Sequence, residues 1–169
     1  MIFLTKLQRL FAEGDFTATY KFALLIALAD LAVEQGRDDG CELMLTNRQI
    51  GERFIHLYWQ QAAAYGTGRP GAESGVLVQN TGAQAAVVSA IVAVRQTMPA
   101  ANPQVAARHP AYPGLLRGVT QTVSAMPLNY LQNFGGETDE FLYERAGPGQ
   151  ILLRPGVAFC LRRFQPLVQ

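Results

Sequence analysis

Residues 15–59 read DFTATYKFALLIALADLAVEQGRDDGCELMLTNRQIGERFIHLYW, and the rest of the chain is expected to pack around this stretch. Its first part predicts a helix over residues 17–35 that is apolar on nearly every side. A helix of this kind belongs in the middle of a hydrophobic core. Gly36 ends the helix, and residues 37–40 form a polar turn that leads into the second part.

The second part of this stretch predicts a short strand at residues 43–45 and then a capped helix. Thr46 followed by Gln49 matches a capping box, so the helix begins at Asn47. The helical period directs the apolar side chains inward, namely Ile50, Phe54, Leu57 and Tyr58. It directs the polar side chains outward, namely Arg48, Glu52, Arg53 and Gln60. Buried helix, strand, capped helix and later strand resemble the order of a winged helix.

The rest of the chain predicts further helices and one hairpin around this unit. An apolar stripe over residues 2–11 indicates a first helix. A glycine-rich loop at 66–75 leads into a strand at 76–78, and a helix then runs from about residue 80 to 95. Short helices follow Pro103 and Pro113, with one further turn at 128–132. Residues 141–143 and 151–153 predict a β-hairpin, and 157–164 the start of an amphipathic helix.

We therefore expect an α+β fold that is predominantly helical, with one core around the buried central helix and a small β element. The whole chain, residues 1–169, is expected to form a single domain. Its parts are a helical organising unit (1–65), a flexible loop (66–75), a helical part (76–134), and a β-hairpin with the start of a C-terminal helix (141–169).

Composition indicates a well-buried globular protein, since hydrophobic residues make up 49% of the chain and charged residues 16%. The net charge of +1 argues against a protein coated with basic residues. The charge is uneven, however: residues 1–44 carry four basic and seven acidic side chains, and residues 45–130 carry six basic and two acidic ones. Both a basic binding face and an ordinary solvated surface fit this distribution.

Cysteine usage and the chain ends predict a soluble cytoplasmic protein. Cys41 and Cys160 lie far apart in the sequence and are expected to be free thiols in a reducing compartment. The first ten residues lack the pattern of a signal peptide, and the apolar run at residues 22–29 is too short to span a bilayer. The apolar-rich end near Gln169 suggests that the native polypeptide continues.

The sequence does not present a catalytic motif. His56 and His109 are the only histidines, and neither has a Cys or carboxylate at metal-ligand spacing. Three carboxylates, Glu137, Asp139 and Glu140, are close enough in sequence to gather a divalent metal, but a solvated turn is the favoured explanation for them. We expect no catalytic residue and no metal or other cofactor within these residues.

Several polar residues are candidates for contacts to nucleic acid. Guanidinium and amide groups form the bidentate hydrogen bonds that phosphates and base edges accept. A helix that opens near Asn80 could also receive a phosphate at its N-terminus. The candidate set is Lys21, Arg48, Gln49, Arg53, Asn80, Gln84, Arg162 and Arg163.

Several phrases of the sequence together resemble the N-terminal region of bacterial proteins of the HNH endonuclease type. They are YKFALLIALADLAVE (20–34), FIHLYW (54–59), GVLVQNTG (75–82), MPL (126–128), GGE (135–137) with FLY (141–143), and PGVAFC (155–160). The resemblance extends over nearly the whole chain.

This resemblance implies a protein of DNA cleavage or phage defence. In such proteins a ββα-metal module nearer the C-terminus supplies a histidine base and holds a divalent cation. His56 and His109 do not match that module, so no catalytic residue is carried over. The resemblance implies a DNA-binding recognition or accessory module, with DNA and a C-terminal HNH module or partner subunit as partners. A divalent metal would belong to the missing HNH module.

Two other classes of function are compatible with the residues. The first is a protein-interaction or oligomerisation domain that holds partner subunits through an apolar face. The second is an enzyme that acts through the carboxylates of residues 137–140. The salt dependence of binding distinguishes the DNA-binding hypothesis from the protein-interaction hypothesis, because binding to phosphates weakens steeply as the salt concentration rises.

Overall fold

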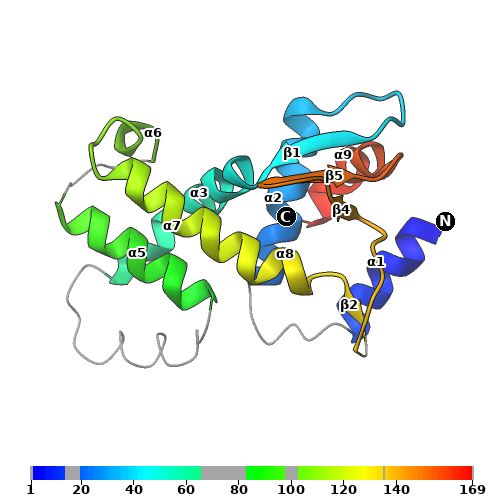
Figure 1. Cartoon of the computed structure of the whole chain (residues 1–169), viewed down its shortest axis with the longest axis horizontal. Helices are drawn as coiled ribbons and strands as arrows, with labels where there is room; N and C mark the ends of the chain where they lie inside the picture. Colours follow the sequence, from blue (N-terminus) through cyan, green and yellow to red (C-terminus); the bar gives the residue numbers. More distant parts are fainter. Residues whose placement is uncertain (1, 14–19, 66–82, 98–102, 135, 169) are drawn as a thin grey trace.

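A computed structural model describes residues 2–13, 20–65, 83–97, 103–134 and 136–168 (Figure 1). The helices are α1 (Ile2–Glu13), α2 (Tyr20–Gln35), α3 (Asn47–Tyr65), α5 (Ala83–Thr97), α6 (Pro103–Ala106), α7 (Tyr112–Ala125), α8 (Pro127–Tyr130) and α9 (Val157–Val168). The strands are β1 (Leu43–Thr46), β2 (Asn133–Phe134), β3 (Glu137–Thr138), β4 (Tyr143–Arg145) and β5 (Gln150–Leu153). The expected class, a predominantly helical α+β fold, is confirmed.

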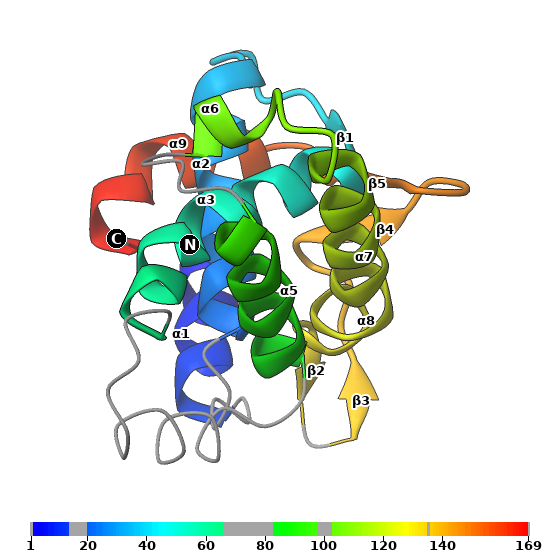
Figure 2. The same ribbon diagram turned by 90° about the vertical axis from the view of Figure 1, so that its left-hand side faces the viewer.

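Helix α2 lies at the centre of the core, as its apolar surface predicts. Seven of its side chains are fully or almost fully buried: Leu24, Leu25, Ala27, Leu28, Ala29, Leu31 and Ala32. Helices α9, α3 and α8 all pack against it. Helices α3, α5 and α7 also contact one another, and Figure 2 shows α5 and α7 beside each other with α3 behind them.

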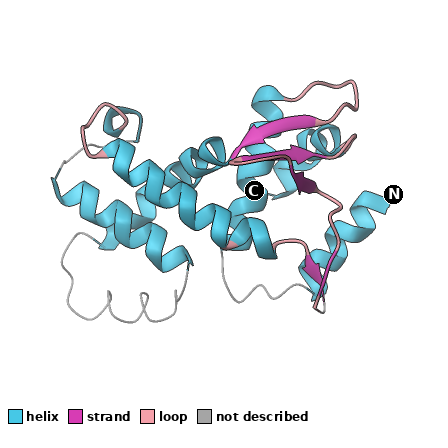
Figure 3. Ribbon diagram, viewed as in Figure 1, coloured by secondary structure: helices cyan, strands magenta, loops and turns pink. Residues whose placement is uncertain are grey.

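The three-stranded antiparallel sheet joins distant parts of the chain. Its strand order is β1-β5-β4, so β1 pairs with the second strand of the hairpin. In this register Leu45 lies opposite Ile151, and both side chains are buried. Figure 3 shows these strands at the same end of the molecule as α9 and α1, away from α5 and α6. The expected strand at 43–45 and the expected hairpin are both confirmed.

The predicted capping box is present at the start of α3. The backbone N–H of Gln49 donates to the Thr46 hydroxyl (3.1 Å), and the backbone N–H of Thr46 donates to Gln49 Oε1 (2.8 Å). Two N–H groups that the helix leaves unpaired are thereby satisfied. The inward set is also confirmed for Ile50, Phe54 and Tyr58, which are buried, whereas Leu57 is half-buried.

Three details near the hairpin differ from the expectation. Strand β4 begins at Tyr143 and not at residue 141, because its partner strand β5 ends at Leu153, opposite Tyr143, and the backbone N–H of Leu142 donates to the Gln132 side chain instead. The break expected at residues 135–136 is instead flanked by a short antiparallel pair, β2 and β3. Residues 128–132 contribute a single turn that starts earlier, at Pro127.

Some expected features lie outside the described residues. They are the start of the central helix at residues 17–19, the loop at 66–75, the strand at 76–78, and Asn80. Among the described residues, no helix is long and apolar enough to cross a bilayer.

Candidate functional site

A cleft between the first turn of α3 and the outer face of α7 is the strongest candidate for a binding site. It has a volume of about 310 Å³ and is lined by Arg48, Pro113, Leu116, Arg117, Thr120 and Gln121. Two of these side chains are guanidinium groups that come from different helices. We refer to this feature as the α3–α7 cleft.

Packing fixes the orientation of α7 and therefore the polar wall of the cleft. Leu115, Leu116, Val119 and Val123 are buried on its inner side. Arg117 and Gln121, spaced one helical turn apart, are exposed on its outer side. This segregation is typical of an amphipathic helix with its apolar stripe in the core.

Gly51 allows α3 and α7 to approach closely at the cleft. A Cβ atom on Gly51 would lie 2.6 Å from Thr120 Oγ1 and 3.3 Å from Thr120 Cα. Both distances are shorter than the contacts that real Cβ atoms normally make, so a larger residue would push the helices apart. The Thr120 hydroxyl oxygen is buried and has no hydrogen-bond partner among the described residues.

The α3–α7 cleft carries positive charge that is only partly compensated. The side chain of Arg48 is 74% exposed, and its Nε lies 3.8 Å from a carboxylate oxygen of Glu52. Among the described residues, no carboxylate forms an ion pair with Arg117. Burial raises the pKa of Tyr112 at the start of α7, and the neighbouring Glu52 raises it further. Because Arg117 has no carboxylate partner among the described residues, the α3–α7 cleft is suited to an anion.

The β4–β5 hairpin is fastened to both helices of the cleft. Arg145 in β4 donates to the carbonyl of Ser124 in the last turn of α7 (2.8 Å) and to Oδ1 of Asn129 in α8 (2.7 Å). The Gly149 carbonyl accepts a hydrogen bond from the backbone N–H of Asn47, the first residue of α3 (2.8 Å). The hairpin and the two helices thus hold a fixed relative position.

The structure gives the sequence-predicted contact residues very different surroundings. Arg48 lines the cleft, whereas Gln49 is used in the capping box and in a hydrogen bond to Gln35. Arg53 forms an ion pair with Glu34 of α2. Lys21 is only 6% exposed, so it does not lie on the open surface that a contact to DNA requires. Asn80 and the side chain of Gln84 lie outside the described residues.

The two arginines of α9 also have partners within the chain. Arg162 donates to the carbonyls of Val33 (2.9 Å) and Gly36 (2.8 Å) and contacts Asp38 (3.1 Å). It therefore caps the C-terminal end of α2, where unpaired carbonyls and the helix dipole favour a cation. The expected exposed polar position of Arg162 is thus a packed one. Arg163 is exposed and stacks over the ring of Phe159, with 4.7 Å between Cζ and the ring centroid.

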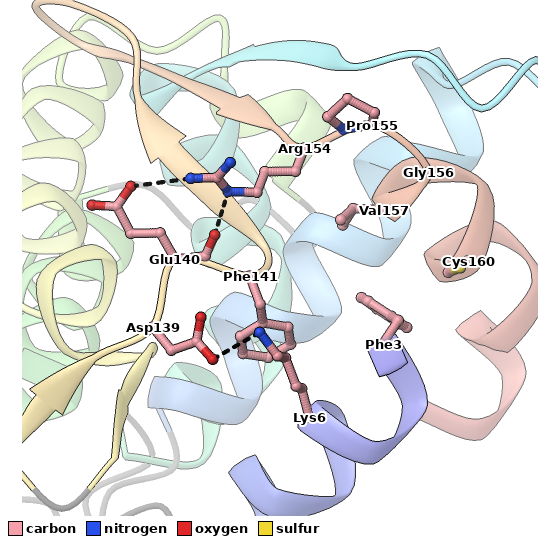
Figure 4. A pocket seen from close by; sticks show the side chains of 10 residues that line it. All are labelled: Phe3, Lys6, Asp139, Glu140, Phe141, Arg154, Pro155, Gly156, Val157 and Cys160. Atoms are coloured by element: carbon pink, nitrogen blue, oxygen red, sulfur yellow. Dashed lines mark hydrogen bonds and ion pairs between the residues drawn. The ribbon is translucent and has the colours of Figure 1, made fainter. Parts of the chain in front are cut away.

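A second, larger pocket lies between α1, residues 139–141 and the start of α9 (Figure 4). Its volume is about 590 Å³, and its walls include the rings of Phe3 and Phe141. Its charges are paired within the chain: Lys6 with Asp139 at 2.9 Å, and Arg154 with Glu140 at 3.6 Å. These pairs join neighbouring segments and leave the pocket without an evident excess of either charge.

The carboxylates of residues 137–140 do not gather around a common point. Asp139 faces Lys6, Glu140 faces Arg154, and Glu137 is exposed on β3. In the described part of the chain, no three His, Cys, Asp or Glu side chains are placed to hold a metal ion. Burial, followed by the nearby Arg53, lowers the pKa of His56 below its usual value.

Arg117, Thr120 and Gln121 were not predicted from the sequence as site residues. Their signal was present, because Arg117 and Gln121 form an i, i+4 polar pair opposite the apolar side chains of the same helix. The sequence carries no signal for the packing of α3 against α7, which brings these three residues close to Arg48.

The fold and the cleft define a predominantly helical α+β domain that presents two guanidinium groups between two packed helices. Residues 3–164 match the family described as a domain of unknown function (DUF8808), and the chain belongs to this family. No match was found among curated proteins or among solved structures.

Proposed function

We propose that this protein is a DNA-associated recognition or accessory module that works with an HNH-type nuclease, in DNA cleavage or phage defence. It would position duplex DNA and leave the cutting to an HNH module elsewhere in the polypeptide or in a partner. The α3–α7 cleft, with Arg48 and Arg117 facing an open surface, is the observation that carries the proposal. The association with HNH nucleases rests on the sequence resemblance.

The arrangement of helices around the cleft supports binding to a duplex. The order α2, β1, α3, α7 and hairpin, with β1 beside β5, resembles that of a winged helix, although α5 and α6 lie between α3 and α7, and α8, β2 and β3 precede the hairpin. In helix-turn-helix proteins one helix enters the major groove while its neighbour contacts the backbone. By this comparison α7 presents Arg117 and Gln121 to the DNA, and α3 presents Arg48. Arginine and glutamine are side chains that contact phosphates and base edges.

Fluorescence anisotropy with a labelled random duplex, measured across a salt series, tests the proposal. We expect binding that weakens steeply with salt, because phosphate contacts release counterions. Arg48→Ala with Arg117→Ala is expected to weaken binding about tenfold or more and to reduce the salt slope by about two. Arg37→Ala, at an exposed position of the α2–β1 turn, is the matched control and should bind as the wild type does.

Two results would count against the proposal. Wild-type protein that does not bind a duplex even at low salt would remove the DNA-associated role. Binding that is insensitive to salt would indicate association through apolar surface instead, which is the behaviour expected of a protein-interaction domain.

A further inference from the structure

We infer that the α3–α7 cleft is a discrete site for a single phosphate group, which it takes from the nucleic-acid backbone. This inference rests on the proposed function and specifies the chemical group that the surface holds. The site would serve to fix the register of the protein on the duplex, because phosphate contacts position a protein without reading the sequence.

The two guanidinium groups provide the main recognition. Arg48 from α3 and Arg117 from α7 line the same cleft of about 310 Å³. An arginine presents its N–H groups in a planar fork that matches the oxygens of a phosphate. Arginines from two separate helices can approach one phosphate from different sides, which a pair on one helix surface does less easily.

Neutral hydrogen-bonding groups complete the lining. The Gln121 amide is exposed at one wall, and the Thr120 hydroxyl oxygen is buried without a hydrogen-bond partner among the described residues. A phosphate oxygen in the cleft can accept a hydrogen bond from the Gln121 amide, whereas the Thr120 hydroxyl packs against Gly51 between the helices.

The backbone of α7 favours the same ligand. Its N-terminal end has no side-chain cap, since Ala111 stands at the N-cap and Pro113 in the first turn. The positive end of the helix dipole therefore faces the side of the cleft that Pro113 lines. This contribution is secondary to that of the arginines.

Two exposed glycines allow a ligand to approach the backbone of α7 closely. A Cβ atom on Gly114 or Gly118 would meet nothing within 4 Å. Packing within the described residues therefore does not explain either glycine, although glycine in a helix interior is less favourable than alanine by about 1 kcal/mol. The absence of side chains here lets a phosphodiester backbone lie against the helix beside Arg117.

Inorganic phosphate is the probe that tests the cleft alone. We expect titration of the labelled protein with phosphate to shift the backbone amide NMR signals of Thr120 and Gln121. Chloride at equal ionic strength should shift them little. Arg117→Ala should abolish the selective shifts. Glu52→Gln should increase the affinity for phosphate in this titration several-fold, because it removes the carboxylate beside Arg48. Arg37→Ala should titrate as wild type, and a circular dichroism spectrum confirms that each variant is folded.

The outcomes separate this inference from the proposed function. Equal shifts in phosphate and chloride, or shifts retained in Arg117→Ala, would overturn the phosphate site. If the wild type binds a duplex and Arg48→Ala and Arg117→Ala bind it equally well with the same salt slope, the site is overturned while the function stands. If the wild type binds no duplex, the proposed function fails and the phosphate titration alone decides the site.

Discussion

Truncation of Gln132 to alanine should destabilise the protein more than any exposed substitution. Gln132 is 4% exposed and lies just before β2. Its Oε1 accepts hydrogen bonds from the backbone N–H groups of Leu142 (2.8 Å) and Tyr143 (3.1 Å). Its Nε2 donates to the Tyr143 carbonyl (3.1 Å). The side chain thus takes the place of a neighbouring strand at the start of β4.

The size of the effect follows from the groups left behind. Gln132→Ala leaves two buried N–H groups and one buried carbonyl without a partner, and each such group costs about 1–3 kcal/mol. Water that enters the vacated space offsets part of this loss. We expect the free energy of unfolding to fall by about 3–4 kcal/mol, which lowers the melting temperature by roughly 10 °C in a domain of this size.

Urea unfolding followed by circular dichroism measures this loss. The matched control is Gln104→Ala, because Gln104 is exposed on α6 and its truncation should change stability by less than about 0.5 kcal/mol. A loss below about 1 kcal/mol for Gln132→Ala would refute the reasoning. It would mean that water or a shifted backbone satisfies the three groups without the glutamine.

Other substitutions test the helix packing, a buried hydroxyl and one titrating group. Gly51→Ala should destabilise by about 1–3 kcal/mol, because its methyl group meets Thr120 at 2.6 Å; urea unfolding measures this. Gly118→Ala, on the open face of α7, should instead stabilise by about 1 kcal/mol, and an unchanged or lower melting temperature would contradict this. Tyr143→Phe leaves a buried carbonyl without its 2.7 Å hydrogen bond and should cost about 1–2 kcal/mol, measured in the same way. Burial lowers the pKa of His56 below 6.5, so the unfolded chain binds its proton more readily and stability falls as pH drops through about 6.5. His56→Gln should flatten that part of the stability profile, measured by thermal unfolding between pH 5 and about 8.

The sequence allowed the larger elements to be predicted because their patterns are local. The apolar surface of α2, the capping box at Thr46 and Gln49, and the two apolar runs of the hairpin each lie within a few residues. Such patterns determine local structure before any tertiary contact forms. The pairing of β1 with β5 carries no such signal, since more than a hundred residues separate the partners.

The candidate site was only partly predictable for the same reason. Arg48 was expected to face outward, and it lines the cleft. Arg53 and Arg162 have the same residue type, but Arg53 pairs with Glu34 and Arg162 caps α2. Residue type indicates what an arginine can bind. Whether it is available for a ligand depends on which carboxylates and carbonyls the fold brings beside it.

The packing of α9 against α2 has a consequence for how the protein is made. Arg162 donates to the carbonyl of Ala32, 130 residues earlier in the chain. A ribosome therefore completes α2 well before it reaches α9, and synthesis at the usual rates of 5–20 residues per second leaves an interval of about 6–25 s. During that interval the apolar surface of α2 lacks its final cover. The nascent chain therefore depends on transient contacts or chaperones during this interval, and the core around α2 is completed only after α9 has been synthesised.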